Sequence, residues 1–186
     1  MNANRYLYLV IVVSLLFSSC ENDIATVNKI TSRNASSVET GTQIEMVYSD
    51  YGIVKAKLTT PQIQEYHTIN PYYEMTKGVF IDFYNDSLVV NSTLKAGYGI
   101  AYLKTNLLVA RENVVVVNQK GDKLTSEELQ WDERTKKLTS DKFVTITTAD
   151  ETIYGDGLEA NQDFTQYKIK KIKGTVKVNN DNIPHD

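Results

Sequence analysis

Hydrophobic and polar residues alternate along most of the chain after residue 42, and this period of two is typical of β-strands with one buried face. Four times, an extended stretch, a polar turn and a second extended stretch lead to a leucine. The turns are Ser49-Asp50, Asn85-Asp86, Gly121-Asp122 and Asp150-Glu151, and the leucines are Leu58, Leu94, Leu129 and Leu158. The leucines are 36, 35 and 29 residues apart. This nearly constant spacing predicts an all-β domain of repeated strand-turn-strand units that bury their apolar faces against one another.

Residues 113–146 show the alternation most clearly, as three strands joined by polar turns. The residues predicted to point inward are Val114, Val116, Leu124, Leu129, Trp131, Leu138, Val144 and Ile146. Two layers with such apolar inner faces form either a closed core or an open apolar channel, and the pattern is compatible with both.

Two local features need separate treatment. Residues 60–66 begin with Thr60-Pro61, which is compatible with a helix start, but Pro71 follows closely, so a strand or irregular structure is preferred. Asp156-Gly157 is predicted to form a turn.

The N-terminal segment is typical of a bacterial targeting sequence. Arg5 precedes the apolar residues 6–17, which are fewer than the roughly 20 that a membrane span needs. The sequence Leu16-Phe17-Ser18-Ser19-Cys20 resembles a lipoprotein box, which implies that Cys20 becomes the lipid-modified first residue of the mature chain. The alternative is an ordinary signal peptide or a buried structural cysteine. We expect a signal peptide at residues 1–19, a lipid-anchored flexible linker at 20–41, a domain at 42–178 and a disordered tail at 179–186.

The composition argues against several classes of function. The 186 residues carry a formal net charge of −3, so nucleic acid is not expected as a partner. His67 and His185 are the only histidines and Cys20 is the only cysteine, so no cluster has the spacing of a metal site. No glycine-rich phosphate loop or nucleophile motif is present in the sequence. We therefore expect no metal and no cofactor.

Carboxylates and lysines remain as candidate chemistry. The carboxylates occur as the adjacent pairs Glu127-Glu128, Asp132-Glu133 and Asp150-Glu151. Adjacent residues of a strand point to opposite faces, so these pairs are not expected to share a catalytic site. The lysines gather near the C-terminus, at Lys168, Lys170, Lys171, Lys173 and Lys177. They form either a solvated face or a surface for lipid phosphate or acidic partner groups.

Five segments together resemble the LptC family, most closely its lipoprotein-type members from Bacteroidetes. They are residues 48–52 (YSDYG), 77–85 (KGVFIDFYN), 95–110, 113–146 and 153–169, within a resemblance that covers residues 42–178. LptC proteins are periplasmic components of the lipopolysaccharide-export ABC transporter. The resemblance implies a V-shaped β-jellyroll of the OstA/LptA/LptC type. It implies a non-enzymatic carrier that accepts lipopolysaccharide from the inner-membrane subunits and passes it to an LptA-like bridge protein of the same fold.

This resemblance also implies a role for the inward residues, which would line a groove for acyl chains. The candidates are Val79, Ile81, Val114, Val116, Leu124, Leu129, Trp131, Leu138, Val144, Ile146, Leu158, Val176 and Val178. Better-known members carry a transmembrane helix, whereas this chain offers Cys20, so we expect lipid anchoring at the periplasmic face of the inner membrane. Two other hypotheses stay open: a structural or adaptor lipoprotein with a closed β-sandwich core, and a carbohydrate-active enzyme that uses Glu128 or Asp132.

Overall fold

The computed structural model of the chain describes residues 38–177, and this part contains eleven strands and no helix. The expected signal peptide, Cys20, Val178 and the C-terminal tail lie outside the described residues. The strands are β1 (Val38–Asp50), β2 (Ile53–Tyr66), β3 (Tyr72–Met75), β4 (Val79–Tyr84), β5 (Val90–Ala96), β6 (Tyr98–Tyr102), β7 (Leu107–Asn118), β8 (Lys123–Asp132), β9 (Lys137–Thr147), β10 (Glu151–Asn161) and β11 (Tyr167–Lys177).

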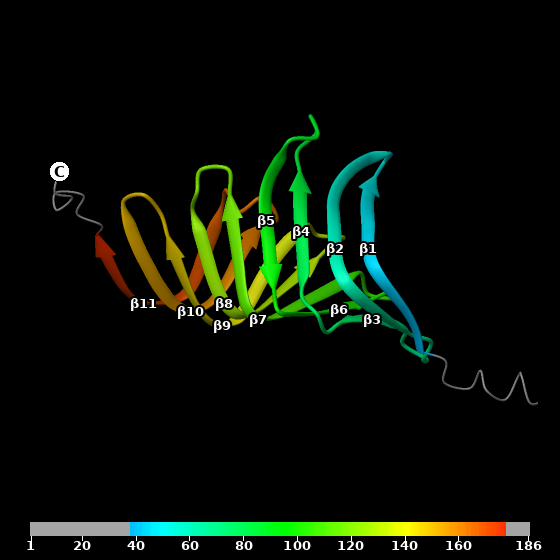
Figure 1. The fold of residues 1–186 in the computed structure, drawn as a ribbon. Coiled ribbons are helices and arrows are strands. Elements are labelled where there is room, and N and C mark those ends of the chain that lie inside the picture. Colours follow the sequence, from blue (N-terminus) through cyan, green and yellow to red (C-terminus); the bar gives the residue numbers. More distant parts are fainter. Residues whose placement is uncertain (1–37, 178–186) are drawn as a thin grey trace, which may run out of the picture. The chain divides into compact units, whose positions relative to one another are not determined.

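The four polar turns predicted from the sequence all join neighbouring antiparallel strands. They connect β1 to β2, β4 to β5, β7 to β8 and β9 to β10, and they lie along the top edge of the ribbon in Figure 1. The four leucines that follow these turns are buried, with at most 9% of their surface exposed. The repeated unit of the sequence is therefore a hairpin whose second strand carries an inward leucine.

Some boundaries differ from the sequence-based expectation. Residues 60–66 continue β2 as a strand, which agrees with the preferred interpretation. Asp156-Gly157 is not a turn but lies inside β10, where the ladder to β9 shifts register. The first strand begins at Val38, inside the segment expected to be linker.

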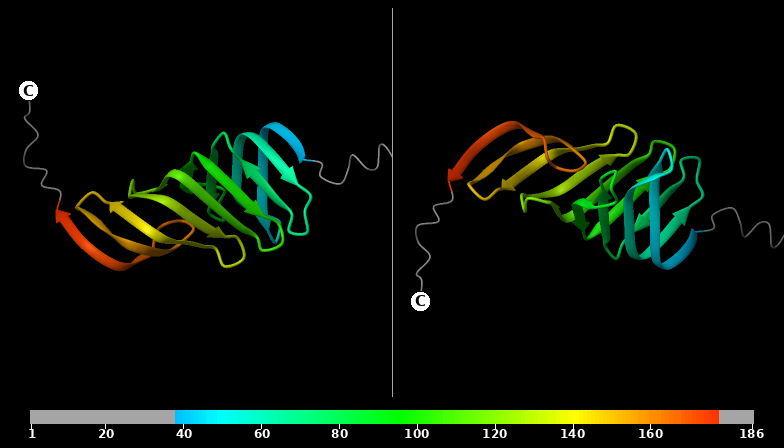
Figure 2. Two further views of the ribbon diagram at one scale, coloured as in Figure 1. Left: turned by 90° about the horizontal axis from the view of Figure 1, so that it is seen from below. Right: turned by 90° about the horizontal axis from the view of Figure 1, so that it is seen from above.

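The sheet folds over into two layers because its long strands take part in both. β2 pairs with β4 through residues 56–59 and with β3 through residues 64–66. β7 pairs with β6 through residues 107–111 and with β5 through residues 115–118. From β7 to β11 the strands follow one another in sequence order (Figure 2). The fold is the all-β jellyroll that was predicted.

Each long strand bends where it changes layer, and the bends have local causes. In β7 the bend falls at Glu112 and Asn113, which both have positive φ, of 67° and 55°. The ladder between β7 and β8 shifts register there, between Arg111 and Val114. Gly97, between β5 and β6, donates its N–H to the carbonyl of Glu112 at 2.8 Å. This contact fastens the neighbouring connection to the bend.

Buried hydroxyl groups accompany the bends of β2, β8 and β9. The ladder between β8 and β9 is interrupted between Ser126 and Gln130. Ser126 donates its hydroxyl to the carbonyl of Phe143 at 3.0 Å, and Ser140 donates to the carbonyl of Glu128 at 2.7 Å. In β2, Thr60 donates to the carbonyl that precedes β4, at 2.8 Å. Because a buried polar group without a partner costs about 1–3 kcal/mol, these hydroxyls stabilise the fold of the sheet.

The interior between the layers is filled with apolar side chains. All eight residues predicted to point inward from residues 113–146 are at most 3% exposed. They form one cluster with Phe83 and Leu94 of the hairpin β4–β5, and with Phe164, which the β10–β11 turn inserts from the far side. In this part of the molecule the inner faces therefore form a closed core.

Two glycines let β11 approach β10 closely. A Cβ on Gly155 would lie 2.1 Å from the carbonyl oxygen of Lys171, and one on Gly157, whose φ is 75°, would lie 2.7 Å from the Lys170 side chain. No other residue type fits at Gly155 without displacing the backbone of β11. The last strand is thus docked through a position that only glycine satisfies.

We predict that Gly155→Ala lowers the free energy of unfolding by about 2–3 kcal/mol, because the added methyl group collides with the backbone of β11. Urea denaturation measures this change, and amide hydrogen exchange should show loss of protection in β11. Gly121→Ala is the control, since a methyl group at Gly121 would have no neighbour within 4 Å and only the φ of 86° is unfavourable. The control should cost about 1 kcal/mol. Equal losses for the two variants would contradict the prediction.

Candidate functional site

One apolar cavity lies at the β1 end of the sheet, between strands of the two layers. Its solvent-accessible volume is about 240 Å³. Its walls come from β1 (Met46, Val47, Tyr48), β2 (Ala56, Leu58, Ile63), β3 (Tyr73, Met75), β6 and the turn after it (Ala101, Tyr102, Leu103, Asn106), β7 (Leu107, Leu108) and β8 with its turn (Trp131, Glu133). The volume far exceeds the roughly 10–15 Å³ that a single buried water needs.

The cavity is open to solvent on one side. Two of the residues that line it, Val47 and Leu103, are 59% and 38% exposed. Deeper in the cavity the lining is buried, with Met75 and Leu108 at most 2% exposed. An apolar guest could therefore reach the cavity from solvent and leave water behind as it moves inward.

Two polar contacts join the walls of the cavity across its opening. Tyr48 of β1 donates its hydroxyl to the backbone carbonyl of Glu133 at 3.3 Å. Beside it, the ammonium group of Lys136 lies 2.7 Å from the carboxylate of Asp50. These contacts connect the β1–β2 hairpin to the β8–β9 turn, which are more than eighty residues apart in the sequence. They are the only side-chain hydrogen bonds or ion pairs between the outermost hairpin and that turn within residues 38–177.

The charged groups at the opening have shifted pKa values. Burial raises the pKa of the Glu133 carboxyl group, and the neighbouring negative charge of Asp132 raises it further. Burial also raises the pKa of Tyr48, with smaller contributions from Asp50 and Glu133. The hydrogen bond to Asp50 raises the pKa of Lys136, so that this ion pair is favoured in its charged form. The cavity wall thus disfavours negative charge at Glu133.

Trp131 forms the floor of the cavity. Its ring meets Tyr48 edge-on, with centroids 5.9 Å apart, and Phe83 edge-on at 5.0 Å. Its indole Nε1 is buried and has no hydrogen-bond partner in the described part of the chain. Packing against the two aromatic rings therefore holds this side chain in place.

The groove residues predicted from the sequence occupy three kinds of position. Trp131 lines the cavity. Ten others are at most 3% exposed in the filled core: Val79, Ile81, Val114, Val116, Leu124, Leu129, Leu138, Val144, Ile146 and Leu158. Val176 is 55% exposed on β11, and Val178 lies outside the described residues. Their contact with lipid stays a prediction.

Sequence reasoning missed most of the cavity. Met46 and Tyr48 were visible as an alternating pattern in the first strand, but nothing in that pattern marks an unfilled space. Tyr73, Ala101 and Tyr102 belong to the short strands β3 and β6, which the sequence did not separate from their neighbours. The only local indication of this cavity in the sequence is a small residue, Ala101, at a position that faces long apolar side chains.

The adjacent carboxylate pairs do not share a site. Glu128 is paired with Arg111 at 2.6 Å, and the hydrogen bond from Arg111 lowers its pKa. Asp132 accepts backbone N–H groups of its own turn, chiefly that of Thr135, which lower its pKa. Of the pair Asp132-Glu133 only Glu133 lines the cavity. Glu128 and Asp132 thus each have a partner within the described residues.

His67 belongs to a small polar cluster at the surface. Its Nε2 is 3.3 Å from Glu39 and its Nδ1 is 3.7 Å from Glu65. Glu39 and Glu65 face each other across the β1–β2 ladder, so the imidazole separates two carboxylates of like charge. The ligand-type atoms of the three residues lie within 4.8 Å of one another. The absence of a resident metal stays a prediction from the sequence.

We predict that Glu133→Gln changes stability with a defined pH dependence. The raised pKa means that the folded protein holds this proton more tightly than the unfolded chain does. The contribution of Glu133 to the free energy of unfolding therefore falls as pH rises from the ordinary pKa near 4.5 through the raised one. Relative to wild type, the glutamine variant should gain stability across that interval and keep a constant advantage above it.

Urea denaturation at a series of pH values measures this difference, and the adjacent residue supplies the control. The pKa of Asp132 is lowered, so its contribution is present above the ordinary pKa and is lost as pH falls. Asp132→Asn should accordingly lose stability relative to wild type as pH rises. Curves of the same sign for the two variants would refute the assignment of Glu133 to a desolvated position.

Comparison with known proteins agrees with the fold. A family model described as "Lipopolysaccharide-assembly, LptC-related" matches residues 7–177, which is most of the chain. No match was found among curated proteins. No helix in the described residues is long and apolar enough to cross a membrane. The chain belongs to the LptC family, a non-enzymatic family of lipopolysaccharide transport, and it acts with lipopolysaccharide and the transport machinery at the periplasmic side of the inner membrane.

Proposed function

We propose that this domain is a lipopolysaccharide carrier that takes up acyl chains at the cavity of the β1 end. It receives lipopolysaccharide from the inner-membrane subunits of the export ABC transporter and passes it along the jellyroll to an LptA-like periplasmic bridge protein. No covalent step is required of this chain. Cys20, outside the described residues, would hold it to the membrane through its lipid.

The observation that carries the proposal is the cavity itself. It is lined almost entirely by apolar and aromatic side chains, and it opens to solvent in a domain whose family serves lipopolysaccharide transport. Transfer of a methylene group from water to such a lining is favourable by about 0.8 kcal/mol. A fatty acyl chain is the part of lipopolysaccharide that matches this lining.

Passage beyond the cavity requires the walls to part, because the remaining interior is filled. The residues that would have to separate are joined at the opening by the Tyr48–Glu133 and Asp50–Lys136 contacts. Both contacts are near the surface and are weak compared with the buried core. The β1–β2 hairpin is therefore the element that we assign to opening, with an acyl chain taking the space that apolar side chains leave.

Transfer to a partner uses the two ends of the sheet. Within residues 38–177, β1 is paired only with β2, and β11 only with β10, so each has one backbone edge free of these strands. A domain of the same fold can add its own edge strand there by backbone hydrogen bonds, which would join two interiors end to end.

The alternative function is a structural or adaptor lipoprotein with a closed core. The observation that favours it is the complete burial of Val116, Leu129 and Ile146 by the protein's own side chains. On this alternative the cavity is only a packing defect. This alternative function predicts that no lipid copurifies with the protein. It also predicts that lipopolysaccharide export stays normal after the protein is depleted.

Site-specific photo-crosslinking in cells tests the carrier proposal. A benzophenone amino acid replaces Tyr102, which lines the cavity, or Phe143, which is 48% exposed and does not line it. Both substitutions exchange one aromatic side chain for another. We expect lipopolysaccharide adducts at position 102 and several-fold fewer at position 143. Adducts at neither position, or equally at both, would contradict the proposal.

A second variant separates occupancy from general damage. Ala101→Phe places a ring into the cavity, and we expect it to reduce the adduct at position 102 strongly while the far-ultraviolet circular dichroism spectrum remains that of wild type. The matched change Ala96→Ser alters a buried residue that does not line the cavity and should leave the adduct unchanged. An undiminished adduct in a folded Ala101→Phe protein would show that lipid binds elsewhere.

A further inference from the structure

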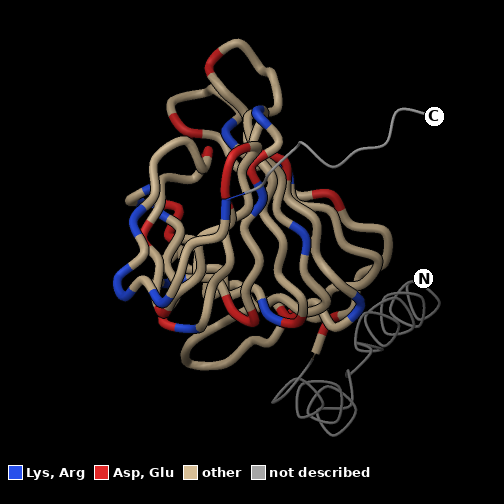
Figure 3. Tube along the Cα trace, turned by 90° about the vertical axis from the view of Figure 1, so that its left-hand side faces the viewer, with Lys and Arg blue, Asp and Glu red and all other residues tan. Residues whose placement is uncertain are grey.

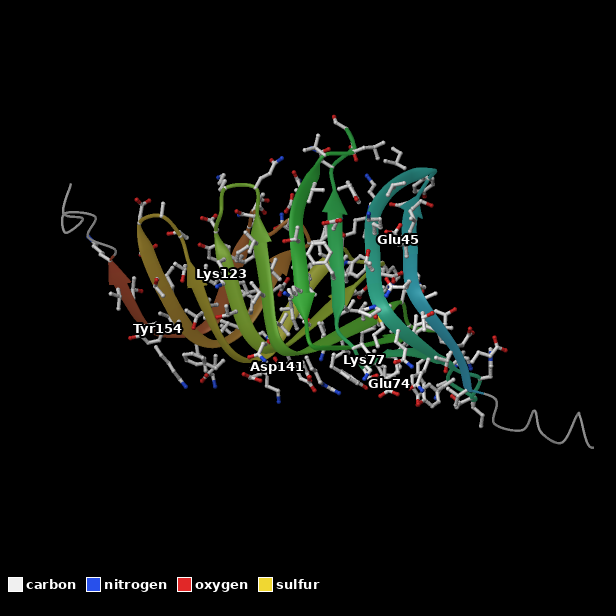
Figure 4. All side chains as sticks on the ribbon, viewed as in Figure 1. Glu45, Glu74, Lys77, Lys123, Asp141 and Tyr154 are labelled. Atoms are coloured by element: carbon white, nitrogen blue, oxygen red, sulfur yellow. The ribbon has the colours of Figure 1, made fainter. Side chains whose placement is uncertain are left out.

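Polar groups are rare in the interior of the described domain. No charged residue among residues 38–177 is buried. Figure 3 shows acidic and basic residues distributed over the turns and strands, and the charged residues labelled in Figure 4 include Glu45, Lys77 and Asp141, which are exposed. The polar residues that are buried within residues 38–177 are Thr60, Ser92, Asn118, Ser126 and Ser140. The interior therefore holds few groups that could recognise a polar part of a ligand.

Each of these five buried residues has a hydrogen-bond partner. The hydroxyl groups of Thr60, Ser126 and Ser140 donate to backbone carbonyls at the bends of the sheet. The Ser92 hydroxyl donates to a carbonyl of the β10–β11 turn at 2.7 Å, and the Asn118 amide donates to another carbonyl of that turn at 2.9 Å. The interior thus meets the usual requirement that a buried donor is paired.

The indole group of Trp131 is the exception among buried donors. The residue is 3% exposed, and its Nε1 has no hydrogen-bond partner within the described residues. The other unpaired buried side-chain atom there is an acceptor, Oε1 of Gln162, and that residue is partly exposed and does not line the cavity. An unpaired buried donor is costly to the protein. Because Trp131 lines the cavity, a ligand in the cavity is a natural source of the missing acceptor.

The surroundings of Trp131 favour a ligand group over a single water molecule as this acceptor. The rings of Tyr48 and Phe83 meet the indole ring edge-on. Leu58 and Leu108 line the same cavity. A buried water usually makes about three hydrogen bonds, and such apolar walls offer few partners. A hydroxyl group on an acyl chain is different, because the transfer of the chain out of water itself contributes to binding.

A ligand hydroxyl group in this place also has acceptors for its own proton. The phenolic oxygen of Tyr48 and the carboxyl group of Glu133 belong to side chains that line the same cavity. Access to the indole depends on Tyr48, whose ring contacts that of Trp131 and which belongs to the β1–β2 hairpin. Displacement of this hairpin, to which the carrier proposal assigns the opening, would uncover the indole N–H.

We propose that the cavity selects acyl chains that carry a hydroxyl group, and that Trp131 donates its indole N–H to that hydroxyl. This inference rests on the proposed carrier function and adds the chemistry of the acyl chain. An unsubstituted hydrocarbon chain has no acceptor, so it leaves the indole unpaired in a dry site. Selection by a buried donor is effective because the wrong ligand loses the hydrogen bond while the donor stays desolvated.

Binding of two matched probes to the full-length protein in mild detergent tests this proposal. The probes are methyl myristate and methyl β-hydroxymyristate, which differ only in the hydroxyl group, and their dissociation constants are measured by displacement of a fluorescent fatty acid. Trp131→Phe keeps an aromatic ring and removes the N–H. We expect this change to shift the ratio of the two dissociation constants about tenfold in favour of the plain probe. The comparison of ratios cancels the different solubilities of the probes.

Nuclear magnetic resonance of the wild-type protein supplies a second measurement. The chain contains one tryptophan, so isotope-labelled tryptophan gives a single indole N–H resonance. We expect methyl β-hydroxymyristate to move the indole proton downfield, as a new hydrogen bond does, and methyl myristate to move it less. This measurement needs no substitution, so it tests the proposal even where Trp131→Phe fails to fold.

Two further variants control for location and for general damage. Tyr98→Phe also removes a donor from a ring, but the Tyr98 hydroxyl donates to Glu74 at 2.7 Å and the residue does not line the cavity. This variant should leave the ratio of the dissociation constants unchanged. Ala101→Phe places a ring in the cavity and should weaken the binding of both probes alike.

The outcomes separate this inference from the carrier proposal. An unchanged ratio in a folded Trp131→Phe protein, or an indole resonance that responds identically to both probes, would overturn the selection of hydroxylated chains and leave the carrier function standing. A shift in Tyr98→Phe as large as that in Trp131→Phe would do the same. If neither probe binds to the wild-type protein, the cavity takes up no acyl chain, and the carrier proposal fails together with this inference.

Discussion

The structure depends on the bends at which long strands pass from one layer of the jellyroll to the other. A strand that changes layer interrupts its ladder, and buried backbone groups then need other partners. Ser126 and Ser140 supply hydroxyl groups at this point in β8 and β9, and Thr60 does so in β2. In β10 the irregularity is instead a matter of space, because Gly155 lets β11 approach closely. These residues therefore stabilise the closure of the sheet over its apolar face.

The same folding explains why the domain is filled at one end and hollow at the other. Towards β11, the β10–β11 turn inserts Phe164 and completes the core. Towards β1, the short strands β3 and β6 contribute small or edge-placed side chains such as Ala101, and the space above Trp131 stays open. The hairpin beside this space packs on the core through Ile44, Met46 and Tyr48, and it is joined to the β8–β9 turn by two polar contacts. The cavity and the hairpin that borders it therefore lie at the same end of the sheet.

The two ends of the sheet complete this arrangement. An unpaired edge strand is a liability in a soluble protein, and lysines are a common way of protecting it. On β11 the five lysines stand beside exposed Ile172 and Val176.

The alternation of apolar and polar residues was sufficient to predict the all-β class, the four hairpins and the burial of Val116, Leu129 and Ile146, because a period of two assigns each side chain to a face. The cluster of lysines in β11 and the resemblance to the LptC family were also recognisable in the sequence. The layer changes were not, since Ser126 and Ser140 look like ordinary polar strand residues until the interrupted ladder gives them partners. Whether the interior is filled or hollow was decided only in three dimensions. It depends on how side chains from distant strands, such as Tyr48, Ala101 and Trp131, pack together. The face of the strand on which a side chain lies does not determine how completely the side chains fill the space between the layers.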